Sequence, residues 1–264
     1  MFVGEISVHR PFPWAHLLDY LAHRLIPQVE QVEDGMYMRR IGGHRVTVSF
    51  DVASARLQVE AGGRVKRAQV LAQVGRLLDV EHDASVVDRR LRRSPLLRPR
   101  VERAPGLRPV GAWSPFELGV RTIVGQQVSV AAARTLMHRL VRRCGGGALT
   151  PECVATANLR EIGMPGKRVE TIRSFARALL DGHVDFDRPW LEVDAVLKQM
   201  PGFGPWTRAY LAIRLGRDPD AFPESDVGLM RAAHVATPTE LLALAESWRP
   251  YRAFAATYLW AIDL

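Results

Sequence analysis

The residues best suited to chemistry in this sequence form a glycine-rich turn at the start of a helical pattern. The turn is Met200-Pro-Gly-Phe-Gly-Pro-Trp-Thr207, and its glycines, Gly202 and Gly204, lead into a helix from Pro205. Such a turn leaves backbone N–H groups at the helix start unpaired and pointing one way. These donors and the positive end of the helix dipole favour an anion such as a phosphate. Any tight turn between helices also uses glycine, so the neighbouring residues must decide between the two interpretations.

Two aromatic side chains follow the turn on one face of the predicted helix. Trp206 and Tyr210 are four residues apart, and residues at this spacing are neighbours on a helix surface. The helical pattern continues to Arg214 and ends near Gly216 and Pro219, both of which are stop signals. The spacing is also compatible with two core aromatics. A residue in the first turn beside a Gly-x-Gly hairpin, however, tends to face the bound ligand.

A carboxylate lies at the start of the next predicted helix. Asp226 follows a polar, proline-containing loop and precedes the apolar segment Val227–Ala233. The local pattern predicts an N-cap, a role in which aspartate contributes ~1 kcal/mol. A capping aspartate can still direct one oxygen into a cleft, so capping and catalysis are compatible. Glu224, on the preceding loop, is the nearest competing carboxylate.

This combination of hairpin, aromatics and aspartate resembles the helix–hairpin–helix superfamily of DNA base-excision glycosylases. In that family the hairpin grips the DNA backbone, which implies contacts at Gly202, Gly204 and Thr207, and the aspartate matching Asp226 is the catalytic carboxylate. Trp206 stands where lyase-competent members carry their lysine nucleophile. With a tryptophan at this position, the sequence resembles the alkylated-base glycosylases, notably the inducible bacterial 3-methyladenine DNA glycosylase II group. The resemblance spans essentially the whole chain, through the segments 13–20, 116–130, 163–168, 200–226, 248–255 and 258–260.

The resemblance implies further site residues and some departures from the family pattern. Trp260 and Tyr20 match aromatics of the base pocket, and Gln127 matches the residue inserted into the duplex where the base leaves. The 3-methyladenine DNA glycosylase II type has a leucine at the place of Gln127. A glutamine can hydrogen-bond the orphaned base but is a poorer apolar wedge. Ser225 and Val227 stand where an aspartate and a tyrosine are expected, which implies a roomier and less negative pocket.

The implied function is that of a monofunctional DNA glycosylase acting as a monomer without cofactor or metal. It would hydrolyse the N-glycosidic bond of alkylated purines, of the 3-methyladenine and 7-methylguanine type, flipped out of double-stranded DNA. A related glycosylase for deaminated or oxidised bases stays open. A non-catalytic DNA-binding module would need the hairpin but not Asp226, Trp206 and Trp260 together. A glycosylase–lyase would need a lysine at Trp206, and Lys198 lies on the wrong side of the hairpin.

Composition is compatible with a nucleic-acid partner and excludes several other classes. The formal net charge of +8 and a pI near 10.1 suit a polyanion. Two cysteines, Cys144 and Cys153, exclude a disulfide framework and a four-cysteine zinc or iron–sulfur site. The eight histidines show no metal-binding spacing. No apolar run reaches the ~18 residues that a membrane span needs, and the start is too polar for a signal peptide. We therefore expect a cytoplasmic protein without a membrane partner.

Hydrophobic periodicity predicts an α+β fold. An antiparallel sheet with two helices is expected over residues 1–85, followed by a linker and crossing segment over 86–113. An all-helical body of two lobes completes the chain, with the hairpin in the lobe 114–218 and a C-terminal lobe over 219–264. The basic run Arg89–Arg93 is interpreted as a solvated connector, with direct DNA contact as the alternative. Strands are expected at 2–8, 36–40, 44–50 and 56–61; helices at 14–26, 70–78, 114–144, 151–162, 167–182, 190–200, 205–215, 226–235, 238–247 and 250–262.

Overall fold

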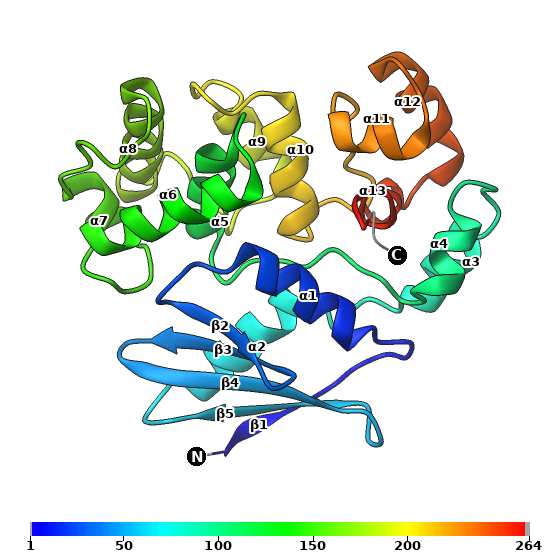
Figure 1. Cartoon of the computed structure of the whole chain (residues 1–264), viewed down its shortest axis with the longest axis horizontal. Helices are drawn as coiled ribbons and strands as arrows, with labels where there is room; N and C mark the ends of the chain where they lie inside the picture. Colours follow the sequence, from blue (N-terminus) through cyan, green and yellow to red (C-terminus); the bar gives the residue numbers. More distant parts are fainter. Residues whose placement is uncertain (1, 262–264) are drawn as a thin grey trace.

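The α+β architecture is confirmed in a computed structural model, which describes residues 2–261. Figure 1 shows the sheet at one end of the molecule and the helical body at the other. Helix α1 (Trp14–Arg24) lies between the two. The helical body divides into a group containing α5 to α10 and a group containing α11 to α13, which stand side by side above α1. Residues from all three parts can therefore meet near α1.

The sheet has five strands in the order β1-β5-β4-β3-β2, and each neighbouring pair is antiparallel. Strand β2 was not predicted because three of its four residues are polar and give no apolar alternation. It pairs only with β3 at the sheet edge. The strands are β1 (Phe2–Ser7), β2 (Glu30–Glu33), β3 (Met36–Ile41), β4 (His44–Asp51) and β5 (Arg56–Ala61).

From residue 67 onward, all the regular elements of the described chain are helices. They are α2 (Arg67–Leu78), α3 (Ala84–Leu91), α4 (Arg98–Arg103), α5 (Pro115–Gly125), α6 (Val130–Arg143), α7 (Pro151–Thr156), α8 (Gly166–Leu180), α9 (Trp190–Leu197), α10 (Pro205–Arg214), α11 (Val227–Ala233), α12 (Pro238–Ala245), the 3₁₀ helix η1 (Glu246–Trp248) and α13 (Arg252–Trp260).

One predicted helix, over 114–144, is two helices in the structure. Helix α5 ends at Gly125, and α6 begins only after Ser129, whose side chain accepts a hydrogen bond from the Ala132 N–H at 3.2 Å. The side-chain cap supplies an acceptor for a donor that the helix start would otherwise leave unpaired. The intervening loop, residues 126–129, contains the glutamine expected to enter DNA.

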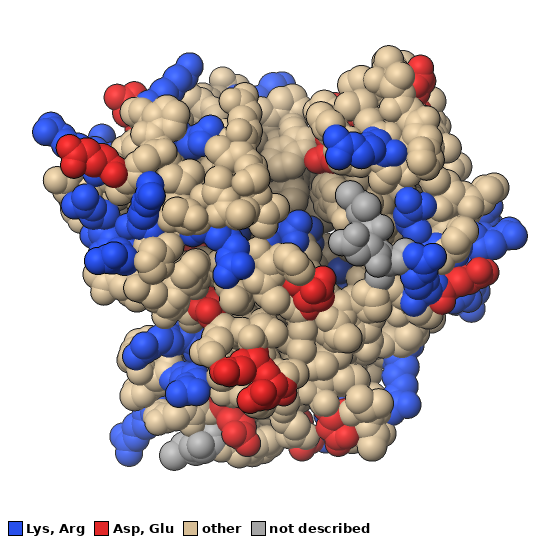
Figure 2. Space-filling view, in the orientation of Figure 1, with Lys and Arg blue, Asp and Glu red and all other residues tan. Residues whose placement is uncertain are grey.

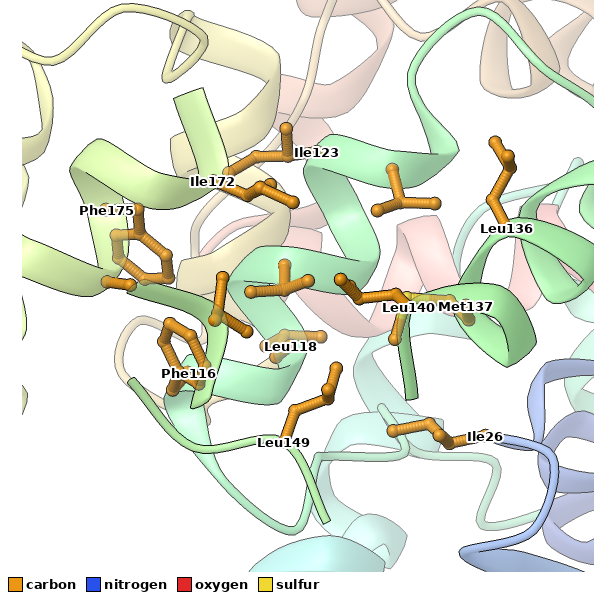
Figure 3. Close-up of a cluster of buried hydrophobic side chains, with 14 of the residues drawn as sticks. Ile26, Phe116, Leu118, Ile123, Leu136, Met137, Leu140, Leu149, Ile172 and Phe175 are labelled. Carbon is orange, nitrogen blue, oxygen red and sulfur yellow. The ribbon is translucent and has the colours of Figure 1, made fainter. Parts of the chain in front are cut away.

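Three hydrophobic cores correspond to the three parts of the molecule. The first joins the sheet with α1 and α2, the second joins α5 to α10, and the third joins α11 to α13 with α3 and α4. Figure 3 shows part of the second core, where Phe116 of α5 stacks on Phe175 of α8 with ring centroids 5.5 Å apart. Burial of such large rings fixes the helices that carry the hairpin.

The segment expected as a linker, residues 86–113, contains most of α3 and all of α4. Leu91, Leu97 and Val101 are fully buried against the C-terminal helices. This part of the chain is thus packed as a component of the C-terminal group (Figure 1). The sequence pattern did not indicate this packing, because the few apolar positions of the segment stand among many arginines.

A buried ionic cluster fastens the sheet to the helical body. Arg39 of β3 donates to both carboxylate oxygens of Glu117 on α5, at 2.7 and 2.6 Å, and to Glu30 at 2.8 Å. All three side chains are almost completely buried. A bidentate guanidinium–carboxylate pair is directional as well as strong, so it fixes the orientation of α5 relative to the sheet.

Candidate active site

The predicted hairpin is formed by α9, the turn that follows it, and α10. Gly202 has φ +87°, and a Cβ at this position would lie 2.6 Å from Cγ2 of Thr171 on α8. Glycine is therefore required both by the backbone conformation and by the close packing. Gly204 caps α10 without a side-chain hydrogen bond, and Pro205 is the first helical residue. The free first-turn N–H groups of α10 leave this end suited to an anion.

Thr207 lies inside the hairpin and is only 3% exposed. Its hydroxyl accepts a hydrogen bond from Nε2 of Gln126 at 3.1 Å, and the same nitrogen donates to the Gly202 carbonyl at 2.8 Å. A DNA contact at Thr207 would thus use its backbone N–H and not its hydroxyl. Gln126, which the sequence reasoning did not assign a role, joins the 126–129 loop to the hairpin. Arg168 fixes the same loop by donating to the Gln126 carbonyl at 2.8 Å.

Gln127 lies in the middle of this anchored loop and is exposed. Its φ of +59° is unusual for a residue with a side chain. The side chain of the neighbouring Gln126 is bonded to the hairpin and its carbonyl to Arg168, so the backbone on which Gln127 stands is fixed. This geometry is suited to a side chain that enters another molecule.

Asp226 caps α11 as predicted and is 9% exposed. Oδ1 accepts the Leu229 N–H at 2.7 Å and the indole N–H of Trp260 at 3.2 Å. Oδ2 accepts the indole N–H of Trp206 at 2.7 Å. Three donors from three helices therefore hold the carboxylate in one position, with the hairpin helix on one side and the C-terminal helix on the other.

The four aromatic residues expected in the pocket are brought together from both ends of the chain. Trp206 and Tyr210 stack with centroids 5.2 Å apart and an angle of 9° between their rings. Trp260 meets Tyr210 edge-on at 5.7 Å. The hydroxyl groups of Tyr20 and Tyr210 lie 3.3 Å apart. A flat apolar ligand can stack in such surroundings.

A buried arginine, Arg214, stands behind these rings, and the sequence reasoning did not identify it. Its guanidinium carbon lies 4.3 Å from the centroid of Tyr20, 5.2 Å from that of Tyr210 and 5.3 Å from that of Trp260. The available signal was helical spacing, because Trp206, Tyr210 and Arg214 recur every four residues.

Charge around Arg214 alters the titration of its neighbours. Burial opposes ionisation of Tyr210, but the positive charges of Arg214 and Arg24, with a hydrogen bond from Tyr20, lower the Tyr210 pKa to about 8. Burial also opposes the charge on Arg214 itself, yet the Tyr20 and Tyr210 oxygens keep its pKa above the usual value. Arg214 is therefore a cation at neutral pH.

A cavity of about 540 Å³ adjoins this cluster, between α1, the 107–110 segment and α13. Tyr20, Trp260 and Arg214 contribute to its wall. Asp226 and Trp206 are not part of the wall but are linked to it through Trp260. The volume is within the range of small-molecule sites. In Figure 2 a hollow lies between the α5–α10 group and the α11–α13 group; its rim is mostly uncharged, with both basic and acidic side chains nearby.

Within residues 2–261, no three His, Cys, Asp or Glu side chains gather as a metal ion would require. Both cysteines are free thiols. The same part of the chain contains no helix that is both long and apolar enough to cross a bilayer.

Comparison with known proteins places the chain in a family. Residues 4–114 match the family model of the AlkA N-terminal domain, and residues 120–240 match that of the HhH-GPD superfamily base excision DNA repair proteins. DNA-3-methyladenine glycosylase 2 of Escherichia coli is 33% identical over 95% of this chain and 94% of its own length. The chain belongs to the HhH-GPD superfamily of base excision DNA repair proteins.

Two further comparisons give another similar sequence and a similar fold. A probable bifunctional transcriptional activator/DNA repair enzyme AlkA of Mycobacterium tuberculosis is 33% identical over 97% of this chain, which spans 56% of that protein. The 3-methyladenine DNA-glycosylase structure from Archaeoglobus fulgidus has a TM-score of 0.83 with 22% identity and covers 98% of both chains. The latter likeness establishes that the whole fold is shared.

Proposed function

We propose that this protein is a monofunctional DNA glycosylase that hydrolyses the N-glycosidic bond of alkylated purines in duplex DNA. The observation that carries the proposal is the position of Asp226, held by the indoles of Trp206 and Trp260 beside an aromatic cavity. Similarity to proteins named DNA-3-methyladenine glycosylase supports the substrate class. We expect it to act as a monomer on DNA in the cytoplasm.

The hairpin is proposed to hold the DNA backbone through the N–H groups at the start of α10. The dipole of that helix and the turn at Gly202 and Gly204 favour a phosphate there. The target base must leave the stack before its C1′ atom can be reached, at a cost of a few kcal/mol. Gln127 would fill the space that the base leaves, because it is exposed on a loop anchored to the hairpin.

The flipped base is proposed to lie against the aromatic residues Trp206, Tyr210, Trp260 and Tyr20. Purines methylated at N3 or N7 carry a positive charge, so stacking on an indole gains a cation–π contribution of ~1–2 kcal/mol when water is excluded. The charge also makes the base a good leaving group. An acid that protonates the leaving group is then unnecessary, which explains how a single carboxylate suffices.

Asp226 is proposed to stabilise the positive charge that grows on the sugar as the base departs. A carboxylate facing an oxocarbenium-like sugar is the same electrostatic arrangement that glycoside hydrolases use. The carboxylate is also placed to orient the water molecule that adds to C1′. Trp206 occupies the position of the lysine that a lyase would need, so no Schiff-base intermediate is expected.

Release of bases from DNA tests this proposal. The wild-type protein should release 3-methyladenine and 7-methylguanine from methylated DNA and leave intact abasic sites, with no product trapped by borohydride. Duplexes containing hypoxanthine or an oxidised purine establish the lesion range. Release of oxidised purines alone, or strand cleavage with a borohydride-trapped complex, would contradict the assignment. Binding without release of any base would favour the non-catalytic module.

A further inference from the structure

Arg214 is a buried charge without a carboxylate partner. It is 4% exposed, its NH1 donates to the Val110 carbonyl at 3.1 Å, and no acidic side chain within residues 2–261 forms a salt bridge with it. Its Nε atom is buried without a hydrogen-bond partner. Within the described chain, the charge is balanced only by the Tyr20 and Tyr210 oxygens and the Val110 carbonyl, and a neutral side chain would fill the position at a lower desolvation cost. We therefore expect the charge of Arg214 to act on a bound ligand.

The charge of Arg214 faces the pocket. It lies over the rings of Tyr20, Tyr210 and Trp260, and it contributes to the wall of the 540 Å³ cavity. Arg108 also contributes to the wall and is fully buried, but its guanidinium donates to the backbone carbonyls of Gly106, Asp79, His82 and Pro11. The other charged groups near the cavity are more exposed. Arg24 is partly exposed over Tyr20, and Asp19 is 74% exposed beside His23. Solvent screens those charges far more than it screens Arg214.

Opposite charges thus flank the same tryptophan. Asp226 accepts the indole N–H of Trp260, while Arg214 lies over its ring at 5.3 Å. If Asp226 faces the sugar, the end of the pocket beyond Trp260 faces the base. The pocket therefore has a negative sugar end and a positive base end.

The sign of the charge matters for how the base departs. When the bond between C1′ and the base breaks, the electron pair moves to the base, and a water oxygen bonds to C1′ as the water loses its proton. A cationic methylated purine leaves as a neutral molecule. A neutral purine such as hypoxanthine leaves as an anion, which then takes a proton from water. A fixed positive charge at the base end stabilises the second kind of departure and opposes entry of a cationic base.

We propose that Arg214 is a specificity-determining residue that shifts the pocket from cationic towards neutral purine lesions. This inference rests on the proposed glycosylase function and refines its substrate class. Trp206 favours cationic bases by stacking, and Arg214 acts in the opposite direction from the other side of Tyr210. With both residues, the pocket accepts a broader range of purine lesions than aromatic side chains alone would allow.

The test compares Arg214→Met and Arg214→Lys with wild type on duplexes containing 7-methylguanine or hypoxanthine, under single-turnover conditions. The Met variant should lower the hypoxanthine-to-7-methylguanine rate ratio by about tenfold or more, where a tenfold change corresponds to 1.36 kcal/mol. The Lys variant retains the charge and should keep the ratio within about threefold of wild type. Arg217→Met is the matched control, because this nearby exposed arginine donates to the Phe186 carbonyl away from the pocket.

An unchanged ratio in folded Arg214→Met, or the same fall in Arg214→Lys, would overturn the inference while leaving the glycosylase assignment intact. Failure of wild type to release any base overturns the proposed function and this refinement together. A second measurement uses binding alone. Non-cleavable 2′-fluoro duplexes carry either cationic 7-methylguanine or its neutral 7-deaza isostere. Arg214→Met should raise the affinity for the cationic base relative to the neutral isostere, and the same relative affinity in wild type and variant would refute the role of Arg214.

Discussion

The indole N–H of Trp206 donates a 2.7 Å hydrogen bond to Oδ2 of Asp226. This contact joins the first turn of α10 to the cap of α11 across twenty residues of sequence. Trp206 thus contacts the carboxylate directly, in addition to its place in the aromatic cluster. Trp206 is expected to have two separable effects, one through its N–H group and one through its ring.

Substitutions at Trp206 should separate these effects. Trp206→Phe keeps a ring but removes a hydrogen bond to a charged group, worth roughly 1.5–3 kcal/mol, so release of cationic and neutral bases should fall alike by at least about tenfold. Trp206→Ala should add a selective loss on 7-methylguanine. Single-turnover rates on both substrates make the comparison. Trp248→Phe, which loses an indole bond to Ser94, controls for stability. Full activity of Trp206→Phe would show that Asp226 does not depend on the indole.

Asp226→Asn should preserve the fold and abolish most of the activity. The amide oxygen can still cap α11, so the fold should survive, but the amide nitrogen cannot accept the Trp206 indole N–H and the melting temperature should fall moderately. Excision should fall by ~10²–10³, the scale on which one preorganised electrostatic group acts. A cationic pyrrolidine in DNA should bind wild type more tightly than the variant, whereas a neutral abasic analogue should bind both equally. Wild-type excision by the folded variant would exclude a catalytic role for Asp226.

Gln127→Ala should reduce excision chiefly where base flipping is difficult. The loss should be large for a lesion in a fully paired duplex and small for the same lesion in a mismatch, because a mismatched base costs less to unstack. Gln126→Ala, in contrast, removes the bonds that tie the loop to the hairpin and should weaken both. Rates on matched and mismatched duplexes provide the readout. Equal losses on the two duplexes for Gln127→Ala would argue against insertion of this side chain.

Arg39→Met should destabilise the protein strongly. It leaves the carboxylates of Glu30 and Glu117 buried with a partner removed, a situation that typically costs about 3–5 kcal/mol. Urea unfolding monitored by circular dichroism measures the difference. Arg56→Met breaks an exposed ion pair with Glu5 and should leave the midpoint almost unchanged. Similar midpoints for the two variants would mean that the buried cluster does not fasten the sheet to α5.

Tyr210 should titrate at unusually low pH. Its pKa of about 8 lies below the value of ~10 for tyrosine in an unfolded chain. The folded state therefore binds fewer protons between these values, and this group adds stability as the pH rises from about 8 to ~10. Its contribution is lost when the pH falls through the folded pKa. Phenolate absorbance should show a step near pH 8 that is absent in Tyr210→Phe and shifted upward in Arg214→Met. Retention of the step in Tyr210→Phe would assign it to another tyrosine.

The sequence was sufficient where local rules dominate. The cap at Asp226, the turn at Gly202 and the helix after Pro205 each follow from the residues themselves, and the structure has all three. The strand periodicity located four of the five strands. The family resemblance supplied the other residues of the candidate site, because Tyr20 and Trp260 lie far from the hairpin in sequence.

The features that escaped prediction depend on tertiary contacts. Strand β2 owes its conformation to pairing with β3, and α4 owes its burial to the C-terminal helices. Gln126 differs from Gln127 only in what surrounds it after folding. Arg214 gave no sign of burial because an arginine is normally exposed, and only the assembled rings reveal its environment.

Helix α10 bears the phosphate-suited end, the stacked aromatics and Arg214 on one rigid rod. At 1.5 Å per residue, Trp206 and Arg214 are about 12 Å apart along its axis. In the proposed complex the helix would act as a spacer of fixed length between the phosphate bound at its start and the flipped base. A single residue inserted after Trp206 would rotate everything beyond it by about 100° and leave the turn intact. The distance between the phosphate-suited turn and the pocket is therefore fixed by α10. Side chains in the pocket can be substituted without changing this distance.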